Sequence, residues 1–250
     1  MFYIIYEVIC DKMKSIAFLV PSTSRDRDWE ELDDTYLYKY LLPSILPVCK
    51  DFKIKVFIGY DDDDKLYGKD SNWLPQFYPP YKCDEEGVKF ELEWVKCMGM
   101  NGMPTSVWNH IGHTAMGQGF EYFMVLGDDI VCDKRKEWLG IFLKNLNKNK
   151  NIGFSAGYSN NDRIPTQFLI HKTHIDIFGY VYPPTIKNWG CDDWMVEIYG
   201  DKYGYWNKDY KLLNVGGDPR YEVEFKRKYI HMLVNRHKKF IKNYVEKNIS

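Results

Sequence analysis

The sequence lacks an excess of charge of either sign: 34 lysines and arginines stand against 35 aspartates and glutamates, a formal net charge of -1. Non-specific nucleic-acid binders and acidic tail proteins need a strongly one-sided charge, so both classes are excluded and no nucleic-acid partner is expected. Repeats and low-complexity segments are also missing. With 45% hydrophobic and 17% aromatic residues among 250, the chain has enough apolar material for one folded domain.

Paired cysteines and long hydrophobic runs are also absent. The six cysteines contain no C-x-x-C pair, which argues against a zinc knuckle or a disulfide framework and favours a reducing, cytoplasmic compartment. The first ten residues, MFYIIYEVIC, are apolar except for Glu7, whereas a membrane span needs about 20 residues. No positive charge precedes them, as it would in a secretory signal. We expect no membrane span, and we interpret residues 1–12 as an N-terminal extension of a domain at 13–250.

Segments with strand and helix patterns alternate along the chain. Apolar or alternating runs predict strands at residues 16–20, 55–60, 89–95, 121–126, 152–158 and 167–171. Helical spacing predicts helices at residues 33–46, 104–117, 138–146, 194–199 and 229–247, with a loop at 67–87. This order predicts an α/β fold, with a mixed, mainly parallel sheet flanked by helices in a single domain.

Polar residues directly follow the first two predicted strands, at the sheet edge where open α/β folds bind ligands. The first strand leads into Pro21, Ser22, Thr23 and, two residues on, Arg25, whose hydroxyls and cation suit the base and phosphates of a nucleotide. The second leads into an acidic run that begins at Asp61. A solvated acidic turn explains that run equally well.

Asp128 and Asp129 follow the strand predicted at residues 121–126. Two adjacent carboxylates repel each other, so they need a cation or hydrogen-bond donors to compensate. Mn²⁺ and Mg²⁺ take carboxylate oxygens together with substrate phosphates. The pair therefore predicts a metal site for a diphosphate, with a turn or helix cap as the alternative.

A second acidic pair, Asp192 and Asp193, lies between Trp189 and Trp194. A carboxylate flanked by aromatic rings combines a general base with faces on which sugar rings can lie. The pair could also cap the helix predicted at residues 194–199. The basic residues between 226 and 239 are most simply a solvated face, although one of them could neutralise a leaving diphosphate.

Five motifs in this order resemble the GT-A fold of nucleotide-sugar-dependent glycosyltransferases. They are FLVPSTSR, IGYDDDD, SVWNHIG, VLGDD and WGCDDW, and together they cover roughly residues 16–209. VLGDD corresponds to the D-x-D motif of the family. If Asp129 is aligned with the third residue of that motif, Gly127 replaces the first aspartate. The sequence is most similar to small virus-encoded glycosyltransferases, which would place it in the host cytoplasm.

The resemblance implies a role for each of these elements. Residues 13–133 would form the nucleotide-sugar half, in which Pro21, Ser22, Thr23, Arg25, Asp61, Asn109 and Asp128 bind a donor such as a UDP-sugar. Asp129 and Asp128 would hold Mn²⁺ or Mg²⁺, with His231 or His237 completing the metal shell. Residues 134–250 would form the acceptor half. There Asp193 deprotonates a glycan or protein hydroxyl with inversion, Asp192 orients that hydroxyl, and Trp189 and Trp194 shape the acceptor cleft.

Two other functions remain open from the sequence. The same fold supports nucleotidyl transfer to a sugar phosphate, although no Gly-rich loop with a Lys/Arg signature follows the first strand. A non-catalytic carbohydrate-binding domain would use the tryptophans without a metal.

Overall fold

The computed structural model describes residues 14–69, 73–78 and 90–249. One sheet dominates it, with eight strands in the order β3-β4-β2-β1-β5-β8-β7-β9. These strands are β1 (Ser15–Ser22), β2 (Lys53–Asp61), β3 (Phe77–Tyr78), β4 (Phe90–Cys97), β5 (Tyr122–Val125), β7 (Phe154–Tyr158), β8 (Phe168–His171) and β9 (Gly204–Lys211). A separate antiparallel pair joins β6 (Ile130–Val131) to β10 (Leu213–Asn214).

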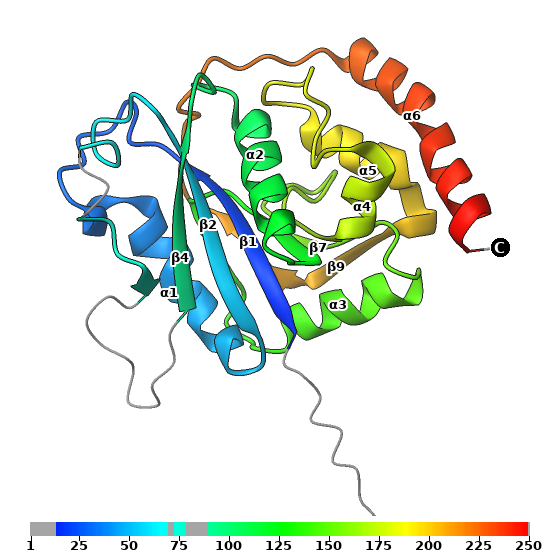
Figure 1. Ribbon diagram of the computed structural model, residues 1–250, viewed down its shortest axis with the longest axis horizontal. Coiled ribbons are helices and arrows are strands. Elements are labelled where there is room, and N and C mark those ends of the chain that lie inside the picture. Colours follow the sequence, from blue (N-terminus) through cyan, green and yellow to red (C-terminus); the bar gives the residue numbers. More distant parts are fainter. Residues whose placement is uncertain (1–13, 70–72, 79–89, 250) are drawn as a thin grey trace, which may run out of the picture.

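The sheet is mixed and mainly parallel, which confirms the predicted fold class. Parallel pairing joins β4, β2, β1 and β5, and also β7 with β9. Antiparallel pairing inserts β8 between β5 and β7 and adds β3 to the other edge. Because β1, β2 and β5 are parallel neighbours, their carboxyl ends meet at one edge of the sheet (Figure 1).

Helices cover both faces of the sheet. One face carries α2 (Pro104–Gly117), α4 (Lys172–Phe178), α5 (Cys191–Tyr203) and α6 (Arg227–Asn248), and the other carries α1 (Leu42–Ile45) and α3 (Trp138–Lys148). Successive side chains of β1 alternate between the faces: Ala17 and Leu19 join the first cluster, and Ile16, Phe18 and Val20 join the second. Figure 1 shows α6 lying outside α4 and α5, and α6 packs against both.

The helix predicted at residues 33–46 is broken into short pieces. Leu32–Asp34, Leu37–Leu41, α1 and Leu46–Lys50 follow one another with different helical pitches. Pro43 and Pro47 lie near the starts of the last two pieces, and because each lacks a backbone N–H, the regular helical hydrogen-bond pattern is interrupted there.

Other elements differ in extent or were not predicted. The short strand β3 lies within the predicted loop at 67–87, and α4, β6, β9 and β10 were not expected. The helix predicted at 194–199 begins earlier, at Cys191, so α5 contains both Asp192 and Asp193. The expected extension at residues 1–12, part of the 67–87 loop and Lys89 lie outside the described residues.

Candidate active site

A cavity of about 690 Å³ opens at the carboxyl ends of β1, β2 and β5. The start of α2, the β7–β8 connection and the start of α5 form further walls. Residues 215–226, which we call the C-terminal strap, contribute Gly217, Asp218, Pro219, Arg220, Tyr221 and Phe225 to the lining. Among the predicted site residues, the cavity is lined by Pro21, Ser22, Thr23, Asp61, Asp128, Asp129, Trp189, Asp192 and Asp193. Both acidic pairs therefore face one space.

The loop after β1 is held in place by Asp64, a residue of the acidic run. The Asp64 carboxylate accepts hydrogen bonds from Thr23 Oγ1 at 3.0 Å and from Ser24 Oγ at 2.8 Å. It also accepts from the backbone N–H groups of Ser24, Leu66 and Tyr67. Asp64 is buried, so this end of the run is not a solvated turn. The Thr23 hydroxyl, predicted to bind nucleotide, is thereby engaged within the protein.

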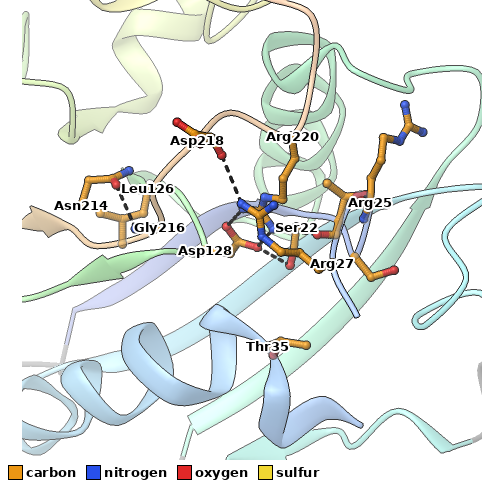
Figure 2. Close-up of polar contacts among 12 residues, drawn as sticks. Ser22, Arg25, Arg27, Thr35, Leu126, Asp128, Asn214, Gly216, Asp218 and Arg220 are labelled. Carbon is orange, nitrogen blue, oxygen red and sulfur yellow. Dashed lines mark hydrogen bonds and ion pairs between the residues drawn. The ribbon is translucent and has the colours of Figure 1, made fainter. Parts of the chain in front are cut away.

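Arg25 lies beside the acidic run rather than in the main cavity. Its Nη2 is 3.4 Å from Asp61 Oδ2 and 3.2 Å from Asp63 Oδ1. Burial raises the pKa of Asp61, and the Arg25 charge opposes this shift. Figure 2 shows the Arg25 side chain pointing away from Asp128. Asp61 itself lines the cavity and stays a candidate for nucleotide binding.

Asp128 is neutralised from within the protein by Arg220 of the C-terminal strap. Arg220 donates through Nη1 to Asp128 Oδ2 at 2.8 Å and through Nη2 to Oδ1, and Nη1 also donates to the Thr23 carbonyl (Figure 2). Ser22 Oγ donates to Asp128 Oδ2 at 2.7 Å. Both carboxylate oxygens are occupied and the side chain is 2% exposed. The expectation that Asp128 binds a metal ion is therefore corrected: it anchors the strap to the loop after β1.

Asp129 differs from Asp128 in its surroundings. Its carboxylate lies against Gly216, where an added Cβ would come within 2.0 Å of Oδ2. Burial and the Asp128 charge raise the pKa of Asp129 to about 6, and Arg220 opposes the shift. This is the behaviour of a carboxylate without a full countercharge.

A divalent cation fits Asp129 alone among the predicted ligands. No cluster of three or more His, Cys, Asp and Glu side chains suited to a metal ion occurs within residues 14–69, 73–78 and 90–249. One or two carboxylates suffice for Mg²⁺ when substrate phosphates supply further oxygens. Asp129 is therefore the residue that would hold such an ion, in company with a diphosphate.

The two histidines considered as metal ligands lie elsewhere. His231 is half-exposed on α6, with Nδ1 2.9 Å from Glu197 Oε2. His237 is buried beside Tyr180, whose Oη is 3.2 Å from Nδ1, and its ring stacks on Phe240. Neither residue lines the cavity. The expectation that one of them completes a metal shell is corrected by this placement.

Asp192 and Asp193 lie in the first turn of α5. The residue at the N-cap is Gly190, with φ of 91°, so neither aspartate caps the helix as the sequence had suggested. Burial and the Asp193 charge raise the pKa of Asp192 to about 8, which leaves it mainly protonated at neutral pH. Asp193 instead forms an ion pair with Arg227, at the start of α6. The pair thus combines a neutral and a charged carboxyl group at the cavity wall.

The two tryptophans around this pair have different positions. Trp189 is 48% exposed and lines the cavity, as an acceptor platform requires. Trp194 is fully buried, with its ring packed on Phe178 and His174. The prediction that Trp194 shapes the acceptor cleft is therefore corrected: it is a core residue.

Asn109 supports the site from behind. Its Nδ2 donates to the Tyr182 carbonyl at 2.8 Å, and its Oδ1 accepts from the N–H groups of Val181 and Tyr182, both at 2.9 Å. It does not line the cavity, so its expected contact with the nucleotide is corrected to a structural role. Its neighbour Trp108 does line the cavity and donates through Nε1 to the carbonyls of Leu19, within β1, and Leu126, just after β5.

Sequence reasoning missed the C-terminal strap. Arg27 Nη2 donates to the Asp218 carbonyl at 3.2 Å, and Asn188 bonds to the backbone of Glu222 and Glu224 (Figure 2 shows the first contact). Arg220 and Arg227 each form an ion pair with one carboxylate of an acidic pair, Asp128 and Asp193 respectively. The basic composition of residues 220–239 was the only available signal, and it does not say which cation meets which carboxylate.

Comparison with solved structures supports the fold class. The chain matches S. aureus TarS with a TM-score of 0.52 and 14% identity, covering 95% of this chain and 44% of that one. A TarS 1–349 structure in complex with UDP gives 0.47 and 13%, covering 95% and 76%. A 4-diphosphocytidyl-2C-methyl-D-erythritol synthase from Anaerococcus prevotii gives 0.43 and 12%, covering 92% and 97%. No known family and no curated protein matches the sequence.

These likenesses concern the fold. The chain spans 60% and 44% of the lengths of two TarS chains that it matches, so it corresponds to part of that protein. The matches give no support to the expected similarity to virus-encoded enzymes. No helix of the described residues has the length and apolar character needed to cross a bilayer. The chain thus has a mixed, mainly parallel α/β fold that resembles the fold of TarS.

Proposed function

We propose that the protein is a glycosyltransferase that moves a sugar from a nucleoside-diphosphate donor to a hydroxyl acceptor. The observation that carries this proposal is the single cavity into which both acidic pairs open, at the carboxyl ends of β1, β2 and β5. A diphosphate needs a countercharge at one end of the site, and an acceptor hydroxyl needs a base at the other. A cation held by Asp129 of the first pair would supply the countercharge, and Asp193 of the second pair would be the base.

The donor would occupy the β1–β2–β5 side of the cavity. Pro21, Ser22 and Asp61 line this side and would contact the nucleoside. Asp129 would hold Mn²⁺ or Mg²⁺, which when bound offsets negative charge on the departing diphosphate. UDP is the natural first probe, because TarS has been crystallised with it.

The acceptor would lie on the α5 side, with one face on Trp189. Asp193 takes the proton of the acceptor hydroxyl while the hydroxyl oxygen forms a bond to the anomeric carbon of the donor sugar. The bond from that carbon to the diphosphate breaks, and the diphosphate leaves with the electron pair. Asp192, neutral at pH 7, donates a hydrogen bond to the acceptor. Attack opposite the leaving group inverts the anomeric configuration.

Phosphorus NMR of donor mixtures tests this function against its alternatives. With Mn²⁺ and a panel of UDP-sugars, we expect slow release of UDP even with water as the acceptor. Formation of pyrophosphate from UTP and a sugar 1-phosphate would instead identify a nucleotidyltransferase. Sugar binding without either product would identify a carbohydrate-binding domain.

A further inference from the structure

Four ionisable side chains form a ladder of contacts between α5 and α6. Asp193 and Glu197 lie four residues apart on α5, and Arg227 and His231 lie four residues apart on α6. Arg227 Nη1 donates to Asp193 Oδ1, and Arg227 Nη2 forms an ion pair with Glu197, 2.8 Å from Oε1. His231 Nδ1 lies 2.9 Å from Glu197 Oε2. The ladder thus runs from the cavity wall to the outside of α6.

Exposure along the ladder shows which end faces the cavity. The Asp193 side chain is 11% exposed and lines the cavity, whereas Arg227 is 46% exposed and does not line it. Glu197 also lies outside the cavity lining. Arg227 therefore reaches Asp193 from the solvent side and leaves the cavity side of the carboxylate clear.

We propose that Arg227 is a positioning residue for Asp193, an inference that rests on the proposed function. A general base must hold one oxygen within about 2.6–3.2 Å of the hydroxyl that it deprotonates. A carboxylate at a helix start can rotate about its side-chain bonds, and this rotation moves both oxygens. The charge-assisted bond from Arg227 to Oδ1 removes that freedom. Oδ2, which makes no hydrogen bond with any other described residue, then serves as the proton acceptor.

The same contacts could act only as a tie between the two helices. In that case the bond from Arg227 to Glu197 matters as much as the bond to Asp193, because both join α6 to α5. The two roles differ in one respect. Positioning acts only through Asp193, so it has no effect once Asp193 can no longer accept a proton.

Kinetics of UDP-sugar hydrolysis by the full chain separate these roles. We expect Arg227→Gln to lower kcat about 10- to 100-fold, because a misplaced catalytic group is costly, while the Kd for UDP changes less than about twofold. Arg227→Lys keeps the charge and should recover part of kcat. Combined with Asp193→Asn, Arg227→Gln should lower kcat no further.

Two variants serve as controls. Lys228→Gln removes a neighbouring cation that forms no ion pair among the described residues, and it should leave kcat unchanged. Glu197→Gln keeps Arg227 beside Asp193, so its effect on kcat should be well below that of Arg227→Gln. Equal losses of kcat in Glu197→Gln and Arg227→Gln would overturn the inference. So would a further loss of kcat when Arg227→Gln is added to Asp193→Asn, or an unchanged kcat in Arg227→Gln. If the wild-type protein turns over no UDP-sugar, the proposed function itself fails, and the inference fails with it.

Discussion

Two carboxylates that are neighbours in the sequence have different environments in the folded chain. Asp128 receives Arg220 and Ser22, which occupy both of its oxygens, while Asp129 next to it has a pKa raised to about 6. The same division occurs at Asp192 and Asp193, where the second carboxylate meets Arg227 and the first has a pKa of about 8. In each pair one aspartate is paired with an arginine, and the other has a pKa raised by burial and by the charge of its neighbour.

Asp129→Asn should remove the metal dependence of nucleotide binding. Wild-type protein should bind UDP more tightly with Mn²⁺ than with EDTA, because a cation joins Asp129 to the diphosphate. In the variant the two affinities should be alike, since the amide carries no charge for the ion. Isothermal titration calorimetry under both conditions measures this. A preserved difference in Asp129→Asn would show that other residues hold the ion.

The acidic pairs could be found from the sequence, but their partners could not. Asp128 and Asp193 belong to the motifs VLGDD and WGCDDW, and hydrophobic patterns place Asp128 after a strand and Asp193 at the start of a helix. Arg220 is 92 residues from Asp128, and Arg227 is 34 residues from Asp193. Such pairs depend on how the C-terminal strap crosses the sheet edge, which no local pattern encodes. Trp194 shows the same limit, because residue type alone does not distinguish a cavity wall from a core.

At the scale of elements, hydrophobic periodicity predicted the buried strands and the longer helices. It failed for segments that are partly exposed, interrupted by proline or held by side-chain hydrogen bonds. β9 carries the sequence GYWNKDYK and is partly exposed along its length, so it shows little apolar signal. Prolines divide the 32–50 segment into short pieces. The C-terminal strap has no regular structure and is fixed by side-chain bonds from Arg27, Asn188 and Arg220.

Close packing of the C-terminal strap on Asp129 gives a test at this scale. Gly216→Ala would place a Cβ within 2.5 Å of Asp129 Cβ and 2.0 Å of Oδ2, so the carboxylate or the strap must shift. We expect weaker Mn²⁺-dependent UDP binding, together with a lower melting temperature because Asp129 Cβ cannot move aside without a backbone shift. Gly117→Ala, at a helix end with open space around it, is the matched control. Equal UDP affinity in both variants would mean that the strap does not set the position of Asp129.

For the whole molecule, buried histidines link stability to pH. His174 is enclosed between α4 and α5, with Nδ1 2.8 Å from Tyr199 Oη and Nε2 2.9 Å from the Val181 carbonyl. Burial lowers the pKa of His174 to about 4. The unfolded chain, with a pKa near 6.5, binds this proton first as the pH falls. The free energy of unfolding should therefore decrease between about pH 6.5 and 4.

His174→Gln removes this titration. In the wild type, the titration of His174 should lower the free energy of unfolding by about 3 kcal/mol between pH 6.5 and 4. The variant should be less stable than the wild type at pH 7 because its side chain fits the site less well, but it should lose less stability on acidification. Urea unfolding at pH 7 and 4.5 measures the difference, with the exposed His110→Gln as control. An equal loss in His174→Gln and wild type would contradict the assignment.

We infer that one cavity brings a nucleotide-sugar donor to a base on α5. Proton NMR of UDP-α-sugar hydrolysis, followed from the first minutes, tests it most directly, because it identifies the anomer released before mutarotation. We expect the β-anomer from wild-type protein, and a rate lowered about 10²- to 10⁴-fold in Asp193→Asn with unchanged UDP affinity. Initial release of the α-anomer, or near-normal turnover in Asp193→Asn, would contradict it.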